Sequence, residues 1–198
     1  MNKNGKTIAI ILGLLAAVAL PLAARAQGGD RGTYVGIGGG SAEPLEYDSC
    51  DLQPQCSKKG TAFKFFSGWQ FSRNWAVEFG YQDLGKASAS SPGTFDQSIK
   101  VRLSDLTILG QWLATERLAF FGKAGAYYGN TTLDTTQSGT TTRIQQSRGN
   151  LTFGVGIQWY AWRTLAIRGE GQRFMKVGGG TIGDSDYSVY TLSLLYKF

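Results

Sequence analysis

The 198-residue sequence contains no histidine. Hydrolases in which a serine or cysteine is activated by a histidine base are therefore excluded. Two cysteines without histidine also make a poor metal site. Acidic pairs such as Glu43 with Glu46, or Asp184 with Asp186, lie in polar, turn-rich segments, where solvated charges are the usual explanation. We expect no catalysis, no metal and no other cofactor.

Runs of Lys and Arg interleaved with aromatic residues are also lacking, so we expect no nucleic-acid partner. The formal net charge is +6, but the first 26 residues carry three basic residues and no acid. The rest of the chain is therefore only modestly positive, which is compatible with an anionic membrane surface. The Gly-rich stretches at 36–40 and 177–184 precede no helical pattern, which argues against phosphate-binding loops.

Only one long hydrophobic run is present, and it lies at the N-terminus. It follows Lys3 and Lys6 and ends at an A-x-A motif around Arg25. This pattern predicts a signal peptide at residues 1–26 and one mature domain at 27–198. A membrane anchor is the alternative, although the run is shorter than the roughly 20 apolar residues that span a bilayer.

The rest of the sequence shows the two-residue period of β-strands, in eight stretches of about ten residues. They lie near 33–42, 61–71, 75–85, 99–113, 117–129, 149–161, 164–175 and 187–198. Short turns at 72–74, 114–116 and 162–163 alternate with long polar connections at 43–60, 86–98, 130–148 and 176–186. This alternation of short turns and long loops is typical of outer-membrane β-barrels, whose short turns face the periplasm.

The two faces of these strands distinguish a membrane barrel from a soluble one. In the stretch 75–82, Trp, Val, Phe and Tyr alternate with Ala, Glu, Gly and Gln. A soluble ligand-binding barrel would have an apolar interior, which leaves no role for Lys64 and Glu78 inside. Aromatic residues beside the short turns would form the periplasmic interfacial girdle, namely Trp75, Trp112, Trp159, Tyr160, Trp162, Tyr196 and Phe198. A soluble core is the alternative for these aromatics.

One predicted strand departs from regular alternation. Within 99–113, Val101 and Leu103 are out of parity with Leu106 and Ile108. We therefore expect a β-bulge near 104–105.

The two cysteines, Cys50 and Cys56, fall in the first long connection. A disulfide between them is expected in an exported protein. Free thiols or a metal site are the alternatives.

Several runs resemble the transmembrane domain of the OmpA family: GWQFSRNWAVEFGYQDLGKA, LAFFGKAGAYYG, GVGIQWYAWRTLAIRGEGQ and YSVYTLSLLYKF. The resemblance covers essentially the whole mature chain. It implies an all-β, eight-stranded antiparallel barrel in the outer membrane of a Gram-negative cell. It also implies that the last strand is read by the barrel assembly machinery, through Tyr190, Leu192, Leu194, Tyr196 and Phe198. No cell-wall-binding domain follows residue 198, so we expect no anchoring to peptidoglycan.

Charged residues inside the barrel form a hydrogen-bonded plug in this family. The inward positions here are the charged Lys64, Glu78, Lys123, Arg168 and Glu170, with Gln111 and Gln158 where family members can carry charges. An eight-stranded barrel is just wide enough to be filled by its side chains, so these charges must be paired. Two interpretations stay open: a plug that stabilises the barrel, or a narrow or gated conductance.

We therefore expect a non-enzymatic outer-membrane barrel with a structural and surface-interaction role through its external loops. A narrow, low-conductance channel is the alternative. The expected partners are outer-membrane lipids and lipopolysaccharide, the assembly machinery, and a surface ligand of unknown identity.

Overall fold

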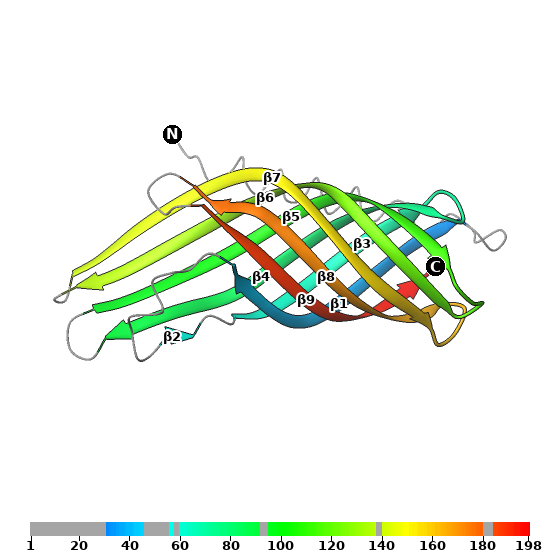
Figure 1. Ribbon diagram of the computed structural model, residues 1–198, viewed down its shortest axis with the longest axis horizontal. Coiled ribbons are helices and arrows are strands. Elements are labelled where there is room, and N and C mark those ends of the chain that lie inside the picture. The colour runs from blue at the N-terminus through cyan, green and yellow to red at the C-terminus, as the bar shows by residue number, and fades with distance from the viewer. Residues whose placement is uncertain (1–30, 46–55, 58–59, 92–94, 138–139, 180–183) are drawn as a thin grey trace, which may run out of the picture.

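A computed structural model describes residues 31–45, 56–57, 60–91, 95–137, 140–179 and 184–198. These residues form one antiparallel sheet that closes on itself (Figure 1). The strands are β1 (Gly32–Pro44), β2 (Cys56–Ser57), β3 (Gly60–Gln70), β4 (Trp75–Ser91), β5 (Phe95–Leu113), β6 (Leu118–Gln137), β7 (Thr140–Tyr160), β8 (Leu165–Gly178) and β9 (Asp184–Lys197). The predicted eight-stranded antiparallel barrel is confirmed, with the two-residue β2 as an addition beside β4. No helix among the described residues is long and apolar enough to cross a membrane.

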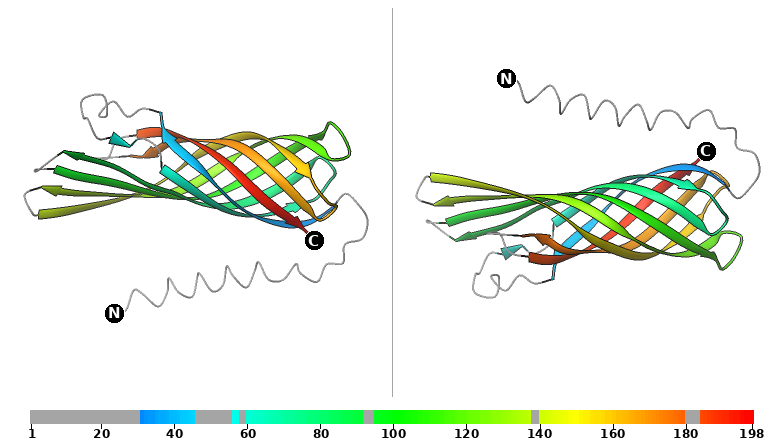
Figure 2. Two further views of the ribbon diagram at one scale, coloured as in Figure 1. Left: turned by 90° about the horizontal axis from the view of Figure 1, so that it is seen from below. Right: turned by 90° about the horizontal axis from the view of Figure 1, so that it is seen from above.

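The barrel closes where its last strand meets its first. β9 pairs with β1 from Tyr34↔Lys197 to Pro44↔Tyr187, and the Phe198 amide donates to the Thr33 carbonyl at 2.9 Å. The pairing of β4 with β5 completes the circle. The C-terminus lies at the end with the short turns (Figure 2). The final strand therefore has no free edge along this ladder.

The opposite end is uneven, and here the predicted long loops at 86–98 and 130–148 are wrong. β4 and β5 remain paired up to Ser91↔Phe95, and β6 and β7 up to Gln137↔Thr140. β5 and β6 are also paired over this length, so four strands continue as one projecting sheet (Figure 2). The sequence feature that favours strands here is the Thr-rich composition at 131–142, because β-branched residues favour strands even where both faces are polar.

The outward face carries a continuous apolar belt, as the alternation predicts. Inward residues of the same strands are almost fully buried. The belt includes Ile37, Phe63, Phe65, Trp69, Phe79, Tyr81, Leu106, Ile108, Trp112, Phe120, Leu151, Phe153, Val155, Ile157, Trp159, Ile167, Leu192 and Leu194. Exposed apolar area of this extent is stable only where lipid covers it.

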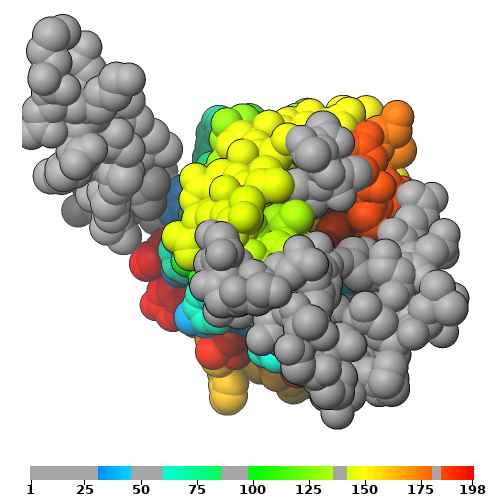
Figure 3. Space-filling model, turned by 90° about the vertical axis from the view of Figure 1, so that its left-hand side faces the viewer, coloured from blue at the N-terminus to red at the C-terminus, as the bar shows by residue number. Residues whose placement is uncertain are grey.

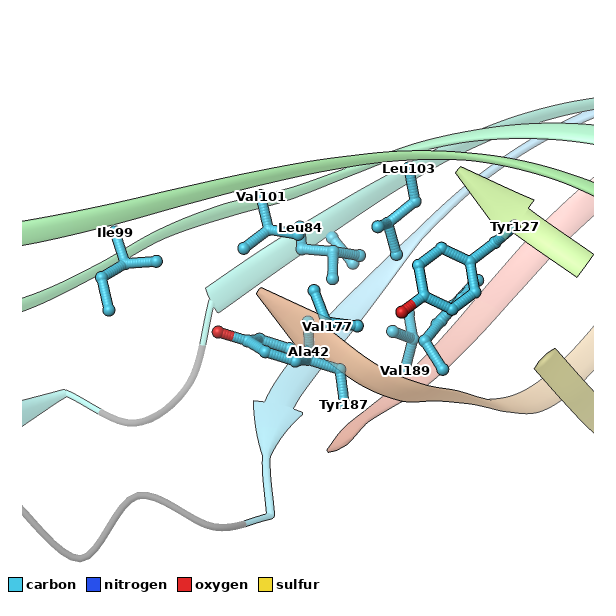
Figure 4. Close-up of a cluster of buried hydrophobic side chains, with 11 residues drawn as sticks. Ala42, Leu84, Ile99, Val101, Leu103, Tyr127, Val177, Tyr187 and Val189 are labelled. Carbon is cyan, nitrogen blue, oxygen red and sulfur yellow. The ribbon is translucent and has the colours of Figure 1, made fainter. Parts of the chain in front are cut away.

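The interior is filled in three layers. The upper layer, towards the projecting sheet, is an apolar cluster drawn from seven strands (Figure 4): Ala42, Ala62, Leu84, Ile99, Val101, Leu103, Tyr127, Phe174, Val177, Tyr187 and Val189. The lower layer, near the short turns, contains Tyr34, Phe66, Ala76, Leu109, Phe121, Ala166 and Leu195. Polar and charged side chains lie between the two clusters.

The bulge predicted near 104–105 is wrong. β5 pairs in continuous register with both neighbours through Ser104 and Asp105. Val101 and Leu103 break parity because they point inward, into the upper apolar layer. The register shift lies instead in β4 between Asp83 and Lys86, where Gly85 has a φ of 75° that favours glycine.

Glycines make room for the rings of the lower layer. A Cβ atom on Gly36 would lie 2.2 Å from the Phe66 ring, and one on Gly68 would lie 2.2 Å from the Tyr34 ring. The Gly-rich stretch at 36–40 thus serves wall packing. Tyr160, which we expected in the outer aromatic girdle, packs against this layer from inside, so that expectation is corrected.

The inward assignment of Leu103 can be tested against Leu106 on the same strand, since their exposed fractions are 1% and 59%. Leu103→Ala should lower the free energy of unfolding by about 2–5 kcal/mol, because the closed wall cannot collapse around the cavity. Leu106→Ala should cost less, since mobile lipid or detergent chains fill the space outside. Urea unfolding in detergent micelles measures both, and the reverse order would contradict the assignment.

Candidate functional site: the charged layer of the interior

Five ionisable side chains meet at mid-height in the barrel. Lys64 extends from β3, Glu78 from β4, Lys123 from β6, and Arg168 and Glu170 from β8. Each occupies an inward position of its strand, and none is more than 6% exposed. The alternation of the strands positions them, and the two apolar layers separate them from the barrel ends.

Glu170 bridges the two lysines. Its Oε1 atom lies 2.7 Å from Lys64 Nζ and 2.5 Å from Lys123 Nζ. One carboxylate therefore holds together β3, β6 and β8, which are not all neighbours in the sheet.

Glu78 forms the second centre of the network. Its Oε1 atom accepts a hydrogen bond from the Tyr34 hydroxyl at 2.7 Å and another from Arg168 Nη1. Its Oε2 atom lies 3.9 Å from Lys123 Nζ, which links the two carboxylates through one lysine. The two acids and three bases thus form one connected group.

The Arg168 guanidinium has further partners. Its Nε donates to Gln158 Oε1 at 2.9 Å. Its Cζ atom lies 4.8 Å from the ring centroids of both Phe66 and Phe121. The guanidinium therefore packs against two aromatic rings, an arrangement that offsets part of the cost of burying a charge.

A third acid, which the sequence did not identify as part of the site, completes the charge balance. Asp105 is 2% exposed, and its two oxygens accept hydrogen bonds from Gln82 Nε2 at 3.2 Å and Gln172 Nε2 at 3.4 Å. Gln172 also donates to Thr152 Oγ1 at 3.0 Å. Three acids now face three bases. The sequence alone did not assign Asp105 to the interior, because a bulge at 104–105 would have left it undecided which face of β5 carries this side chain.

Gln111 lies apart from this layer. Its side-chain amide donates to the Arg73 carbonyl at 2.8 Å, at the end with the short turns. Of the seven interior positions inferred from the sequence, the structure therefore brings six together and leaves Gln111 as a brace for a turn.

The terminal-strand residues have the opposite orientation. Tyr190, Leu192, Leu194, Tyr196 and Phe198 are all between 43% and 66% exposed on the outer face, whereas Thr191, Ser193 and Leu195 are buried inside. The alternation inferred for this strand thus agrees with the geometry. Its recognition by the assembly machinery stays a prediction.

Two predictions fall outside the described residues. The signal peptide at 1–26 is one. The Cys50–Cys56 disulfide is the other, because Cys50 is not described and only the backbone of Cys56 is placed, in β2.

The charged layer has no arrangement suited to catalysis. Among the residues with assigned positions, no group of three or more Asp, Glu or Cys side chains could hold a metal ion. Each acid in the layer is hydrogen-bonded to a cation, a hydroxyl or an amide. The charged side chains fill the lumen and join strands of the barrel wall through ion pairs and hydrogen bonds.

A closed antiparallel barrel with an apolar outer belt and a filled polar interior is the architecture of small outer-membrane β-barrel proteins. The sequence matches the family model described as the OmpA-like transmembrane domain over residues 29–198. The chain belongs to this family, and it is therefore an outer-membrane barrel of a non-enzymatic class. A search of curated proteins finds no match.

Solved structures share the fold at low sequence identity. Ail, the attachment invasion locus protein of Yersinia pestis, is 15% identical with a TM-score of 0.55, covering 87% of this chain and 100% of its own. Neisserial surface protein A is 12% identical with a TM-score of 0.61, covering 86% and 100%. OprG from Pseudomonas aeruginosa is 15% identical with a TM-score of 0.56, covering 86% and 98%.

Removing one charge from the layer tests how much the layer contributes to the free energy of unfolding. Glu78→Gln keeps the shape but leaves Arg168 without its carboxylate, so the free energy of unfolding should fall by about 3–5 kcal/mol. The matched control is Asp83→Asn on the same strand. It weakens the ion pairs with Arg102 and Lys100 near the surface, keeps an oxygen for the Gly85 amide, and should cost at most about 1 kcal/mol. Urea unfolding in micelles measures both variants. Equal effects would show that the buried network contributes no more than a surface pair.

Proposed function

We propose that this protein is a closed structural barrel that presents an external β-sheet for interactions at the cell surface. The single observation that carries the proposal is the projecting sheet. A barrel needs no such sheet merely to span the membrane.

The external sheet has an open edge. β7 begins at Thr140, whereas its pairing with β8 begins only at Thr152↔Phe174. Along residues 140–151, within the part of the chain that the structure describes, β7 is therefore paired on the β6 side alone. This edge is roughly 40 Å long at about 3.4 Å per residue. The atoms of β7 lie at the surface of the end that faces the viewer in Figure 3, where they are yellow. A free edge of this length is suited to strand addition by a protein partner.

The filled lumen supports a structural role over the runner-up, a narrow channel. The upper layer is apolar and spans seven strands, and the charged layer beneath it is cross-linked. A cavity beside the upper layer, lined by described residues of that layer and its rim, measures about 10 Å³. An ion would have to displace both layers in order to cross.

Ion pairs lie outside the barrel wall near its outer end. Arg102 Nε is 3.2 Å from Asp83 Oδ2, and Arg173 Nη2 is 2.9 Å from Asp186 Oδ2. The Lys176 backbone amide donates to Asp186 and holds the pKa of this carboxyl below its ordinary value. Above the lipid-facing belt, such groups are suited to contacts with the phosphates and sugars of lipopolysaccharide.

Export and assembly complete the proposal. Residues 1–26 would direct export and be removed, and the outward face of β9 ending at Phe198 would be recognised by the barrel assembly machinery. A Cys50–Cys56 disulfide would limit the motion of the first external connection.

The projecting sheet can be shortened without changing the net charge. Residues 131–146 contain one acid and one base, and an Asn-Gly turn in their place would join Asn130 to Ser147, which already face each other across the ladder. Adhesion of an expressing laboratory strain to cultured epithelial cells should rise above that of vector-only cells. The shortened variant should bring adhesion most of the way back to the vector-only level, because it removes residues 140–146 of the β7 edge and leaves only a shorter edge on β5 at 95–101.

Equal amounts of folded barrel in the outer membrane must first be shown for both proteins, by the shift of unboiled samples on a denaturing gel. Adhesion that survives the shortening, or that never exceeds the vector-only level, would contradict the role of the projecting sheet.

Planar-bilayer recording separates the structural barrel from the channel. The refolded protein should give no unitary current steps, since the lumen is filled. The double variant Arg168→Ser with Glu78→Ser removes two charges of the layer without leaving a lone charge, and it should also give no steps, because the upper apolar layer still fills the lumen. Steps in the unaltered protein would favour the channel.

A further inference from the structure

A groove lies on the outer wall near the short turns, away from the projecting sheet, and Gln111 and Phe121 of the wall contribute to its lining. It is formed where β4, β5 and β6 pair in the row Trp75↔Gly110↔Gly122. Its volume is about 370 Å³. Trp112, Phe120 and Asn74 also line it.

The groove exists because glycines replace side chains in an otherwise bulky belt. A Cβ atom on Gly122 would meet nothing nearer than the Gly154 carbonyl oxygen at 3.9 Å. The Trp75 ring forms one wall, since it lies 3.2 Å from the position a Gly110 Cβ would take. The Trp112 and Phe120 rings stack with centroids 6.3 Å apart and form another wall.

The depression continues along β6 away from the turns. Ala124 and Ala126 are the next outward residues, and their cross-strand neighbours are larger: Ile108 and Leu106 on β5, and Phe153 and Leu151 on β7. Three small residues in a row on one strand span roughly 13 Å. A depression of this length, one strand wide, can take part of a single acyl chain lying against the wall.

Basic residues flank the groove at the end nearest the turns. Arg73 precedes Asn74, and Arg117 lies in the turn that joins β5 to β6. Among the described residues, neither guanidinium forms an ion pair or a side-chain hydrogen bond. Basic residues at the outer end differ, because Arg102, Arg148 and Arg173 are each paired with an aspartate. The turn arginines therefore have unused positive charge.

We propose that this groove binds one anionic glycerophospholipid of the periplasmic leaflet, with its phosphate between Arg73 and Arg117 and one acyl chain along Gly122, Ala124 and Ala126. The surrounding belt faces the bilayer, so the occupant must be a molecule of the membrane. Charge complementarity selects an anionic headgroup. A second copy of the chain is a poorer fit, because a stable protein interface needs a far larger complementary surface than one strand-wide groove.

The test is native mass spectrometry of protein purified from outer membranes and titrated with phosphatidylglycerol or phosphatidylethanolamine in detergent. The unaltered protein should retain one phosphatidylglycerol in preference to phosphatidylethanolamine. Arg73→Gln and Arg117→Gln should each weaken phosphatidylglycerol binding roughly fivefold. Gly122→Leu should abolish retention of either lipid, because its side chain enters open space and fills the groove.

Two matched controls keep the result interpretable. Arg163→Gln removes the arginine of the third short turn, away from the groove, and Gly169→Leu enlarges an outward glycine on β8 that has similar room. Both should retain the lipid as the unaltered protein does, and gel mobility before boiling confirms folding of every variant. The proposal is overturned by equal binding of the two lipids, by equal losses in the controls, or by a dimer that Gly122→Leu disrupts.

Discussion

The hydrogen-bonded ladder between β1 and β9 is the constraint on which the rest of the structure depends. In a bilayer no water satisfies a free strand edge, so a sheet that spans the membrane must close. Closure over eight strands fixes a narrow interior that side chains have to fill. The inward side chains then have to fill a volume that the barrel wall sets, and their charges have to balance because they are buried. The glycines opposite Phe66 and Tyr34 are one consequence.

The charged layer achieves this charge balance by sharing partners among its side chains. Isolated charges could not be buried here, because the cost of removing each from water would exceed any gain from filling space. Sharing solves this problem: Glu170 serves two lysines, and Lys123 lies near both glutamates. Aromatic rings on either side of Arg168 and the amides around Asp105 supply the remaining partners. The network therefore fastens strands that the backbone ladder does not join directly.

The two ends of the barrel differ in ways that fit different surroundings. At the outer end the ladder continues beyond the membrane-facing belt, and the basic residues there are paired with acids. At the other end the turns are short, and the side chains of Arg73 and Arg117 stay without protein partners among the described residues. The ion pairs at the outer end are the groups for which we propose contacts with lipopolysaccharide. Unpaired charge at the short-turn end favours anionic lipid.

The sequence by itself determined the eight strands, the closed antiparallel barrel, the outward belt and six of the interior positions, because alternation with a period of two is a local property of the chain. Tertiary structure decided the rest. Only three-dimensional pairing, across 106 residues for Lys64 and Glu170, shows which charges meet. It also decided that Val101 and Leu103 face inward, since an apolar layer inside a polar barrel leaves no local signal. The extent of the projecting sheet was also decided there, because Thr-rich polar segments favour strands but form them only when neighbouring strands complete their hydrogen bonds.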